Sequence, residues 1–111
     1  RDVSGVKVLA KIVDGLDANG QRQLSDTLLA RLRSGVIVLG RRDGEKASII
    51  VRVSDDLTDR IKAGNVIKDI VGVVGGRGGG RADMAEGGGP DGSKLPDALE
   101  ASYGSIGRMA A

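Results

Sequence analysis

The stretch Gly75-Gly76-Arg77-Gly78-Gly79-Gly80-Arg81-Ala82-Asp83-Met84 is the most distinctive part of this chain. Ten of the 19 glycines lie between Gly72 and Gly92, so the demand for glycine is local. Glycine has no Cβ, which lets a ligand approach the backbone N–H groups closely. A loop over residues 75–83 can therefore line an anion-binding concavity, with Arg77 and Arg81 beside it. A flexible linker is the alternative, but the run contains no serine and its arginines are four residues apart.

The 111 residues predict a single globular domain, 1–111, that is large enough to bury a core. Apolar residues make up 40% of the chain and Tyr103 is its one aromatic residue, so the core must be aliphatic. Cysteine is absent, which excludes disulfides and agrees with a reduced, cytoplasmic location. No apolar run approaches the roughly 18–20 residues of a membrane span. Because the chain begins at Arg1, we expect it to be a piece of a longer protein.

Positive charge is unevenly distributed, although the formal net charge is only +2. Six basic residues lie between positions 31 and 52, against Asp43 and Glu45. Such a local excess is typical of a surface that faces a polyanion. Modules for single-stranded RNA stack bases on exposed aromatic side chains, which this chain does not supply. Any nucleic-acid contact would therefore use phosphates, 2′-hydroxyls and shape, as suits a folded RNA.

The hydrophobic pattern predicts a strand, a helix and then a hairpin in the first half of the chain. Residues 6–13 alternate between apolar and polar, which indicates a half-buried strand. A helix capped by Asp17 or Asn19 follows, and Gly35 is expected to end it in the left-handed conformation. Residues 36–39 and 46–53 are predicted strands, joined by an Asp-Gly turn over residues 40–45.

The second half is predicted to be mainly helical. Ser54 is the expected cap of a helix over residues 55–63, and Asn65 the cap of another that continues to Gly75. After the glycine loop we expect a short edge strand at 84–86, a turn region over 87–93 and a last helix from Pro96. The predicted class is α/β (α+β): a small mixed sheet with one parallel crossover and one hairpin, and helices packed mainly on one face.

Enzyme chemistry finds little support in the sequence. Histidine and cysteine are absent, so neither can take part in a nucleophile–base pair with the serines and threonines of the chain. The acidic cluster Asp55, Asp56 and Asp59 fits helix capping better than metal binding. No Lys-Ser/Thr pair follows the glycines as in a P-loop, and Arg81 occupies a position where the dinucleotide fingerprint needs glycine or alanine.

The sequence resembles a known family at several points. Two of the similar segments are residues 1–3, which lead into Val6-Lys7-Val8-Leu9, and Val38-Leu39-Gly40. The most distinctive is residues 75–85. These segments resemble the C-terminal domain of alanyl-tRNA synthetase, in the DHH-associated domain group. The likeness extends to about Leu99. Members commonly carry Lys at the position of Arg77 and Pro at that of Ala82; the first difference keeps the charge and the second makes the loop slightly less rigid.

The resemblance implies a non-catalytic domain that holds alanine-accepting tRNA near its outer corner and supports aminoacylation and editing. It implies a parent chain that is an ATP-dependent alanine–tRNA ligase, whose upstream catalytic and editing domains use ATP, magnesium and zinc, with no cofactor in this domain. We expect the isolated domain to be a monomer or a weak dimer. The expected tRNA-binding residues are Arg77, Arg81, Gly76, Gly78, Gly79 and Gly80, with Arg41, Arg42 and Lys46 as secondary contacts. Asp83 is expected to accept local N–H bonds.

Two other functions stay open at this point. One is the accessory domain of a DHH-type phosphoesterase that binds a nucleotide substrate; such relatives usually carry histidines in the glycine motif, and this chain has none. The other is a structural module, in which the glycines only let a helix pack tightly.

Overall fold

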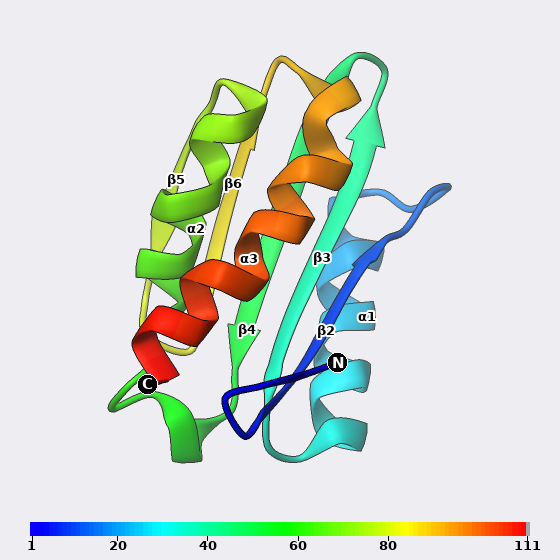
Figure 1. Ribbon diagram of the computed structural model, residues 1–111. Helices are drawn as coiled ribbons and strands as arrows, with labels where there is room; N and C mark the ends of the chain where they lie inside the picture. The colour runs from blue at the N-terminus through cyan, green and yellow to red at the C-terminus, as the bar shows by residue number, and fades with distance from the viewer. Residues whose placement is uncertain (111) are drawn as a thin grey trace.

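Six strands form one mixed sheet in the computed structural model, which describes residues 1–110 (Figure 1). The strand order across the sheet is β1-β2-β3-β4-β6-β5. In chain order the strands are β1 (Asp2–Val3), β2 (Val6–Ile12), β3 (Val36–Asp43), β4 (Lys46–Val53), β5 (Arg77–Gly80) and β6 (Met84–Gly89). The helices are α1 (Ala18–Leu32), α2 (Ala63–Val71) and α3 (Leu95–Ala110), with 3₁₀ turns at Asp55–Leu57, Gly72–Val74 and Gly92–Lys94.

The first half of the sheet has the predicted topology. β2 and β3 are parallel, and α1 connects them as a crossover helix. β3 and β4 form an antiparallel hairpin in which Asp43 pairs with Lys46, so the turn is shorter than predicted. Gly44 has a φ of 62° in this turn, a conformation that glycine adopts without steric cost. The predicted class, with one parallel crossover and one hairpin, is confirmed.

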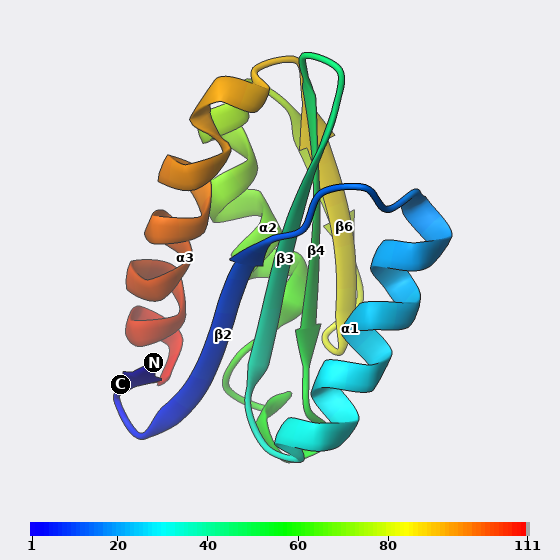
Figure 2. The same cartoon turned by 90° about the vertical axis from the view of Figure 1, so that its right-hand side faces the viewer.

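Helices cover both faces of the sheet, and two of them share one face (Figure 2). α2 and α3 pack over one core cluster, which includes Val36 and Val38. α1 packs on the opposite face over a smaller cluster that includes Ile37 and Leu39. Alternate side chains of a strand point to opposite faces, which is why β3 is apolar along both. The prediction of helices mainly on one face is therefore confirmed, by α2 and α3.

The start of α1 follows the prediction, and its end does not. Asp17 is the N-cap, and its carboxylate accepts a hydrogen bond from the Gly20 N–H at 2.7 Å. The helix ends at Leu32, and its C-cap is Arg33, not Gly35, with a φ of 67° and a ψ of −53°. Gly35 serves another purpose, because a side chain there would overlap the backbone of β2.

The predicted helix over residues 55–63 is wrong. The segment contains one 3₁₀ turn, Asp55–Leu57, and then irregular structure. The Ser54 hydroxyl does not cap a helix; it accepts from the Gly35 N–H at 2.9 Å and donates to the Asp56 carboxylate at 2.5 Å. Because Ser54 ties this segment to the start of β3, it is not available to start a longer helix.

α2 begins at Ala63, so the prediction of Asn65 as its cap is also wrong. The first backbone N–H groups of the helix need acceptors from outside it. Here the N–H groups of Ala63 and Gly64 donate to the carbonyl oxygens of Ala82 and Arg81, at 2.9 Å and 3.0 Å. The turn between β5 and β6 therefore caps α2, and no capping side chain is needed.

The glycine stretch 75–83, predicted as a loop, is mostly a strand and a tight turn. Residues Arg77–Gly80 form β5, the edge strand, which pairs antiparallel with β6. β6 continues to Gly89 and lies between β4 and β5, so the predicted short edge strand at 84–86 and the turn from residue 87 are corrected. Glycine is depleted in strands, and the sequence alone therefore argued against this pair.

Close backbone packing explains why these strands are built from glycine. A Cβ on Gly76 would overlap the carbonyl oxygen of Gly88, and one on Gly78 would lie 2.6 Å from the Cα of Gly87. A Cβ on Gly64 of α2 would lie 2.9 Å from a β5 carbonyl oxygen. Real Cβ atoms do not come so close to backbone atoms, so Gly76 and Gly78 allow the close approach of β6, and Gly64 allows α2 to lie against β5.

We expect Gly76→Ala to destabilise the domain by about 2–3 kcal/mol, because the new methyl group meets rigid backbone. Gly72→Ala is the matched control, since a Cβ at that position has no neighbour within 4 Å. Urea unfolding of both variants measures the difference. Equal midpoints for the two variants would contradict the packing explanation.

Candidate nucleic-acid interface

Arg77, Gly79 and Arg81 point to the same side of β5, because alternate residues of a strand share a face. Gly79 pairs with Glu86 of β6, and Glu86 contacts Arg22 of α1, so this side is the α1 face of the sheet. We call the surface formed by Arg77, Gly79, Arg81 and Glu86 the glycine face. α1 packs over β3 and β4 and leaves the glycine face open.

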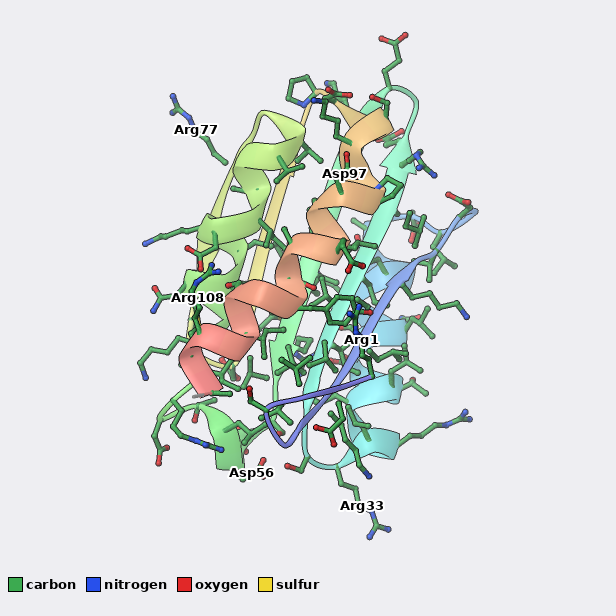
Figure 3. All side chains as sticks on the ribbon, viewed as in Figure 1. Arg1, Arg33, Asp56, Arg77, Asp97 and Arg108 are labelled. Carbon is green, nitrogen blue, oxygen red and sulfur yellow. The ribbon has the colours of Figure 1, made fainter. Side chains whose placement is uncertain are left out.

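The two loop arginines are exposed. Arg77 points away from the body of the protein (Figure 3). The Arg81 side chain is 74% exposed, and its Nε lies 3.3 Å from the Asp83 carboxylate. Asp83 was expected to accept local N–H bonds, and within residues 1–110 its carboxylate pairs with the nearby Arg81 side chain. Its backbone carbonyl accepts from the Val53 N–H at 2.9 Å. Both guanidinium groups can therefore reach a ligand.

Arg22 and Glu86 form an ion pair with two hydrogen bonds, beside Arg77 and Arg81. Nε and Nη2 of Arg22 donate to the two carboxylate oxygens of Glu86, at 2.6 Å and 3.1 Å. The hydrogen bond from Arg22 lowers the pKa of Glu86, and its charge adds to this effect against partial burial. Glu86 is therefore ionised at neutral pH and neutralised by Arg22, so it does not cancel the charge of the loop arginines.

The hairpin arginines lie at the same end of the sheet as Arg77. Arg77 pairs with Gly88, Gly88 with Ser48 and Ser48 with Arg41, so they form one row across four strands. At about 4.8 Å per strand, the backbones of Arg41 and Arg77 are roughly 14 Å apart. Arg41 is half-buried, and its Nε donates to the Gln21 side chain at 3.0 Å, so it is less available than Arg77.

The other two hairpin residues lie at the tip. Arg42 is exposed and donates from Nε to the Gly92 carbonyl at 3.1 Å. Lys46 is exposed at the first position of β4. They extend the basic edge beyond Arg77 and do not join the glycine face, whose members lie on β5 and β6.

The four candidate glycines are not equivalent. Gly76, Gly78 and Gly80 would each bring a Cβ into backbone atoms of β6. Gly79 has no atom within 4 Å of where its Cβ would lie, and it lines a shallow hollow of about 330 Å³ with Arg81 and Glu86. Gly79 is therefore the glycine of this set that presents open backbone to the surface.

The free edge of β5 also exposes backbone groups. The Arg81 N–H donates to the Met84 carbonyl at 2.8 Å, which shows which residues of β5 are hydrogen-bonded to β6. Bonded residues alternate in such a ladder, so the N–H groups of Gly78 and Gly80 point away from β6. They face the outer edge of the sheet, between the two exposed arginines.

Lys68 was not predicted as a site residue, and Arg52 is less exposed than the sequence suggested. Lys68 of α2 is exposed and lies beside β5, but nothing in the sequence indicated that the glycine strand would run along this helix. Arg52 is one of the six basic residues between positions 31 and 52 that were expected to form a surface facing a polyanion. α1 covers it instead: the Arg52 side chain is 17% exposed and pairs with Asp26.

Neither a metal centre nor a membrane span is visible in the described part of the chain. Within residues 1–110, no group of three or more acidic side chains is placed to hold a metal ion. None of the helices there is long and apolar enough to cross a bilayer.

The fold and the glycine face define a member of a known class of domain. Residues 5–106 match the DHHA1 domain family, and the chain belongs to that family.

Several of its relatives are alanine–tRNA ligases. The chain is 54% identical over 99 residues to the alanine–tRNA ligase of Chromohalobacter salexigens, covering 89% of this chain and 11% of the relative. It is 47% identical over 111 residues to that of Rhizorhabdus wittichii, covering 99% of this chain and 12% of the relative. The chain thus spans about a tenth of the length of these relatives.

Two solved structures share the fold. The C-Ala domain of Aquifex aeolicus alanyl-tRNA synthetase superimposes with a TM-score of 0.89 and 29% identity, covering 96% of each chain. RecJ from Thermus thermophilus superimposes with a TM-score of 0.64 and 17% identity, covering 91% of this chain and 14% of that one. The second likeness extends to the fold alone.

The Arg22–Glu86 pair predicts a pH dependence of stability. The pKa of Glu86 is lower in the folded protein than its ordinary 4.5. The ion pair therefore adds to the free energy of unfolding above that pH, and this stabilisation is lost as the pH falls through the pKa of the folded state. Because the pair is partly exposed, we expect less than about 1 kcal/mol. Glu86→Gln should flatten the loss of unfolding free energy between about pH 5 and pH 3, measured by urea titration. Glu45→Gln, on the exposed hairpin turn, is the control; identical profiles for both variants would refute the pairing.

Proposed function

We propose that this chain is the tRNA-binding C-terminal domain of an alanyl-tRNA synthetase and that its glycine face docks the outer corner of alanine-accepting tRNA. The observation that carries the proposal is the pair of exposed guanidinium groups, Arg77 and Arg81, on either side of the bare Gly79. The likeness to the C-Ala domain of a synthetase over 96% of both chains supports it.

The chemistry of the face suits the backbone of a folded RNA. Guanidinium groups bind phosphate with paired N–H donors, and exposed backbone N–H groups add neutral donors. Tyr103, the one aromatic residue of the chain, lies on α3 and not on the glycine face, so base stacking has no platform there. Recognition by phosphate contacts and shape is what these residues can provide.

The domain has no bond-making role in this proposal. Histidine and cysteine are absent, so catalysis and the use of ATP, magnesium and zinc would belong to the upstream catalytic and editing domains of a parent ligase. The domain would hold tRNA while those domains aminoacylate and edit it in the cytoplasm. As an isolated domain it would be a monomer or a weak dimer.

The two alternatives have less support. The accessory domain of a DHH-type phosphoesterase rests on a fold likeness at 17% identity, whereas the likeness to synthetases includes 54% sequence identity. A purely structural role accounts for Gly76, Gly78 and Gly80, where a Cβ would overlap atoms of β6. It gives no reason for Gly79 or for the exposed arginines.

Replacing both loop arginines should weaken tRNA binding with little effect on stability, because both side chains are exposed. We expect Arg77→Ala/Arg81→Ala to lower the affinity for alanine-accepting tRNA at least tenfold and to reduce the slope of log K against log salt by about two. Filter-binding titrations at several salt concentrations measure both quantities.

The matched control removes the same charge from the opposite edge of the sheet. Lys7→Ala/Arg31→Ala, on β2 and α1, should leave the slope close to that of the unmodified domain. Equal losses in the two double variants would mean that binding depends on net charge and not on the glycine face.

A further inference from the structure

Gly79 differs from the other glycines of residues 75–83 because the fold does not require it. Gly75 has a φ of 73°, and Gly76, Gly78 and Gly80 would clash with backbone. Gly79 has neither constraint, since its φ is ordinary and a Cβ would meet nothing within 4 Å. A glycine costs more conformational entropy on folding than alanine does, so its presence at an unconstrained strand position points to a need outside the fold.

Lys68 lies over the same edge from the opposite face of the sheet. Gly64 of α2 lies against Gly80, and the Val71 carbonyl accepts from the Gly76 N–H at 3.1 Å, so α2 runs antiparallel beside β5. Lys68 lies midway between Gly64 and Val71 and is therefore level with the middle of β5. It follows Gly64 by four residues, which places both on one side of the helix.

The contacts of Asp69, the next residue, show which side of α2 faces α3 and which faces β5. Asp69 accepts from the Ser105 hydroxyl at 2.8 Å and lies 3.7 Å from Arg108, both on α3. A residue advances by about 100° around an α-helix, so Lys68 lies on the opposite flank, toward β5. Lys68 is exposed, and within residues 1–110 no ion pair engages it.

We propose that one ribose–phosphate strand of the RNA straddles the β5 edge, with Lys68 on one side and the bare backbone of Gly79 on the other. Lys68 binds a phosphate from the α2 face. Arg77 and Arg81 bind phosphates from the α1 face, and the strand lies against Gly79 between them. The outward N–H of Gly78 lies between the two faces and adds a neutral donor. This inference rests on the proposed function and adds to it a third cation and the direction of approach.

The first test is Lys68→Gln, which keeps a polar side chain of nearly the same length and removes its charge. We expect a three- to tenfold loss of affinity for alanine-accepting tRNA and a salt slope smaller by about one. Lys94→Gln, exposed near the start of α3, is the control and should leave both unchanged. If Lys68→Gln behaves like the control, the straddling arrangement is overturned.

The second test is Gly79→Ala, which fills the open surface with one methyl group. We expect an unchanged or higher melting temperature together with at least fivefold weaker tRNA binding. Gly104→Ala, in α3, is the control, because a Cβ there makes only an ordinary contact with the flexible Arg108 side chain. Unimpaired binding by Gly79→Ala overturns the close approach.

Failure of this inference can be told apart from failure of the proposed function. If the unmodified domain does not bind tRNA, or if Arg77→Ala/Arg81→Ala binds as well as it does, the proposed function fails and this inference with it. If the double arginine variant is impaired while Lys68→Gln and Gly79→Ala bind normally, only the straddling geometry is refuted.

Discussion

The contact of the α2 backbone with the backbone of β5 and β6 is the constraint on which the second half of the domain depends. Gly64 faces β5, and the first N–H groups of the helix donate to carbonyls in the turn between β5 and β6. A helix normally packs on a sheet through its side chains. Here Gly64 has no side chain, so the α2 backbone lies against the Gly80 carbonyl, and α2 and the edge of the sheet form one unit. The exposed arginines are held by this unit and not by a mobile loop.

This arrangement divides one glycine-rich stretch between two roles. Most of its glycines are required by packing, which supports the structural reading for those positions. The arginines and Gly79 are not required in this way and face solvent on the side that α1 leaves open. A basic edge without base-stacking side chains is the feature on which the proposed role in holding a folded RNA depends.

The parts of the fold that follow from local pattern could be predicted from the sequence, and those set by distant backbone contacts could not. The strand pattern of β2, followed by a helix and another strand, predicted the crossover. The Asp-Gly pair predicted the hairpin. Asp17 was a correct cap because its bond to Gly20 is local. Ser54 and Asn65 were wrong because the bonds that replace their capping come from Gly35 and from the β5–β6 turn, far away in sequence. β5 was missed because glycine has no β propensity, and Lys68 could not be linked to the arginines before that strand was known.

The open edge of β5 has a further consequence for how copies of this domain behave in concentrated solution. An unpaired strand edge is a template onto which another strand can add, and proteins commonly protect such edges with charge and short length. β5 has four residues, begins with Arg77 and is followed directly by Arg81. Two copies that met edge to edge would bring these like charges together. The guanidinium groups that suit a polyanion therefore also discourage self-aggregation through the sheet.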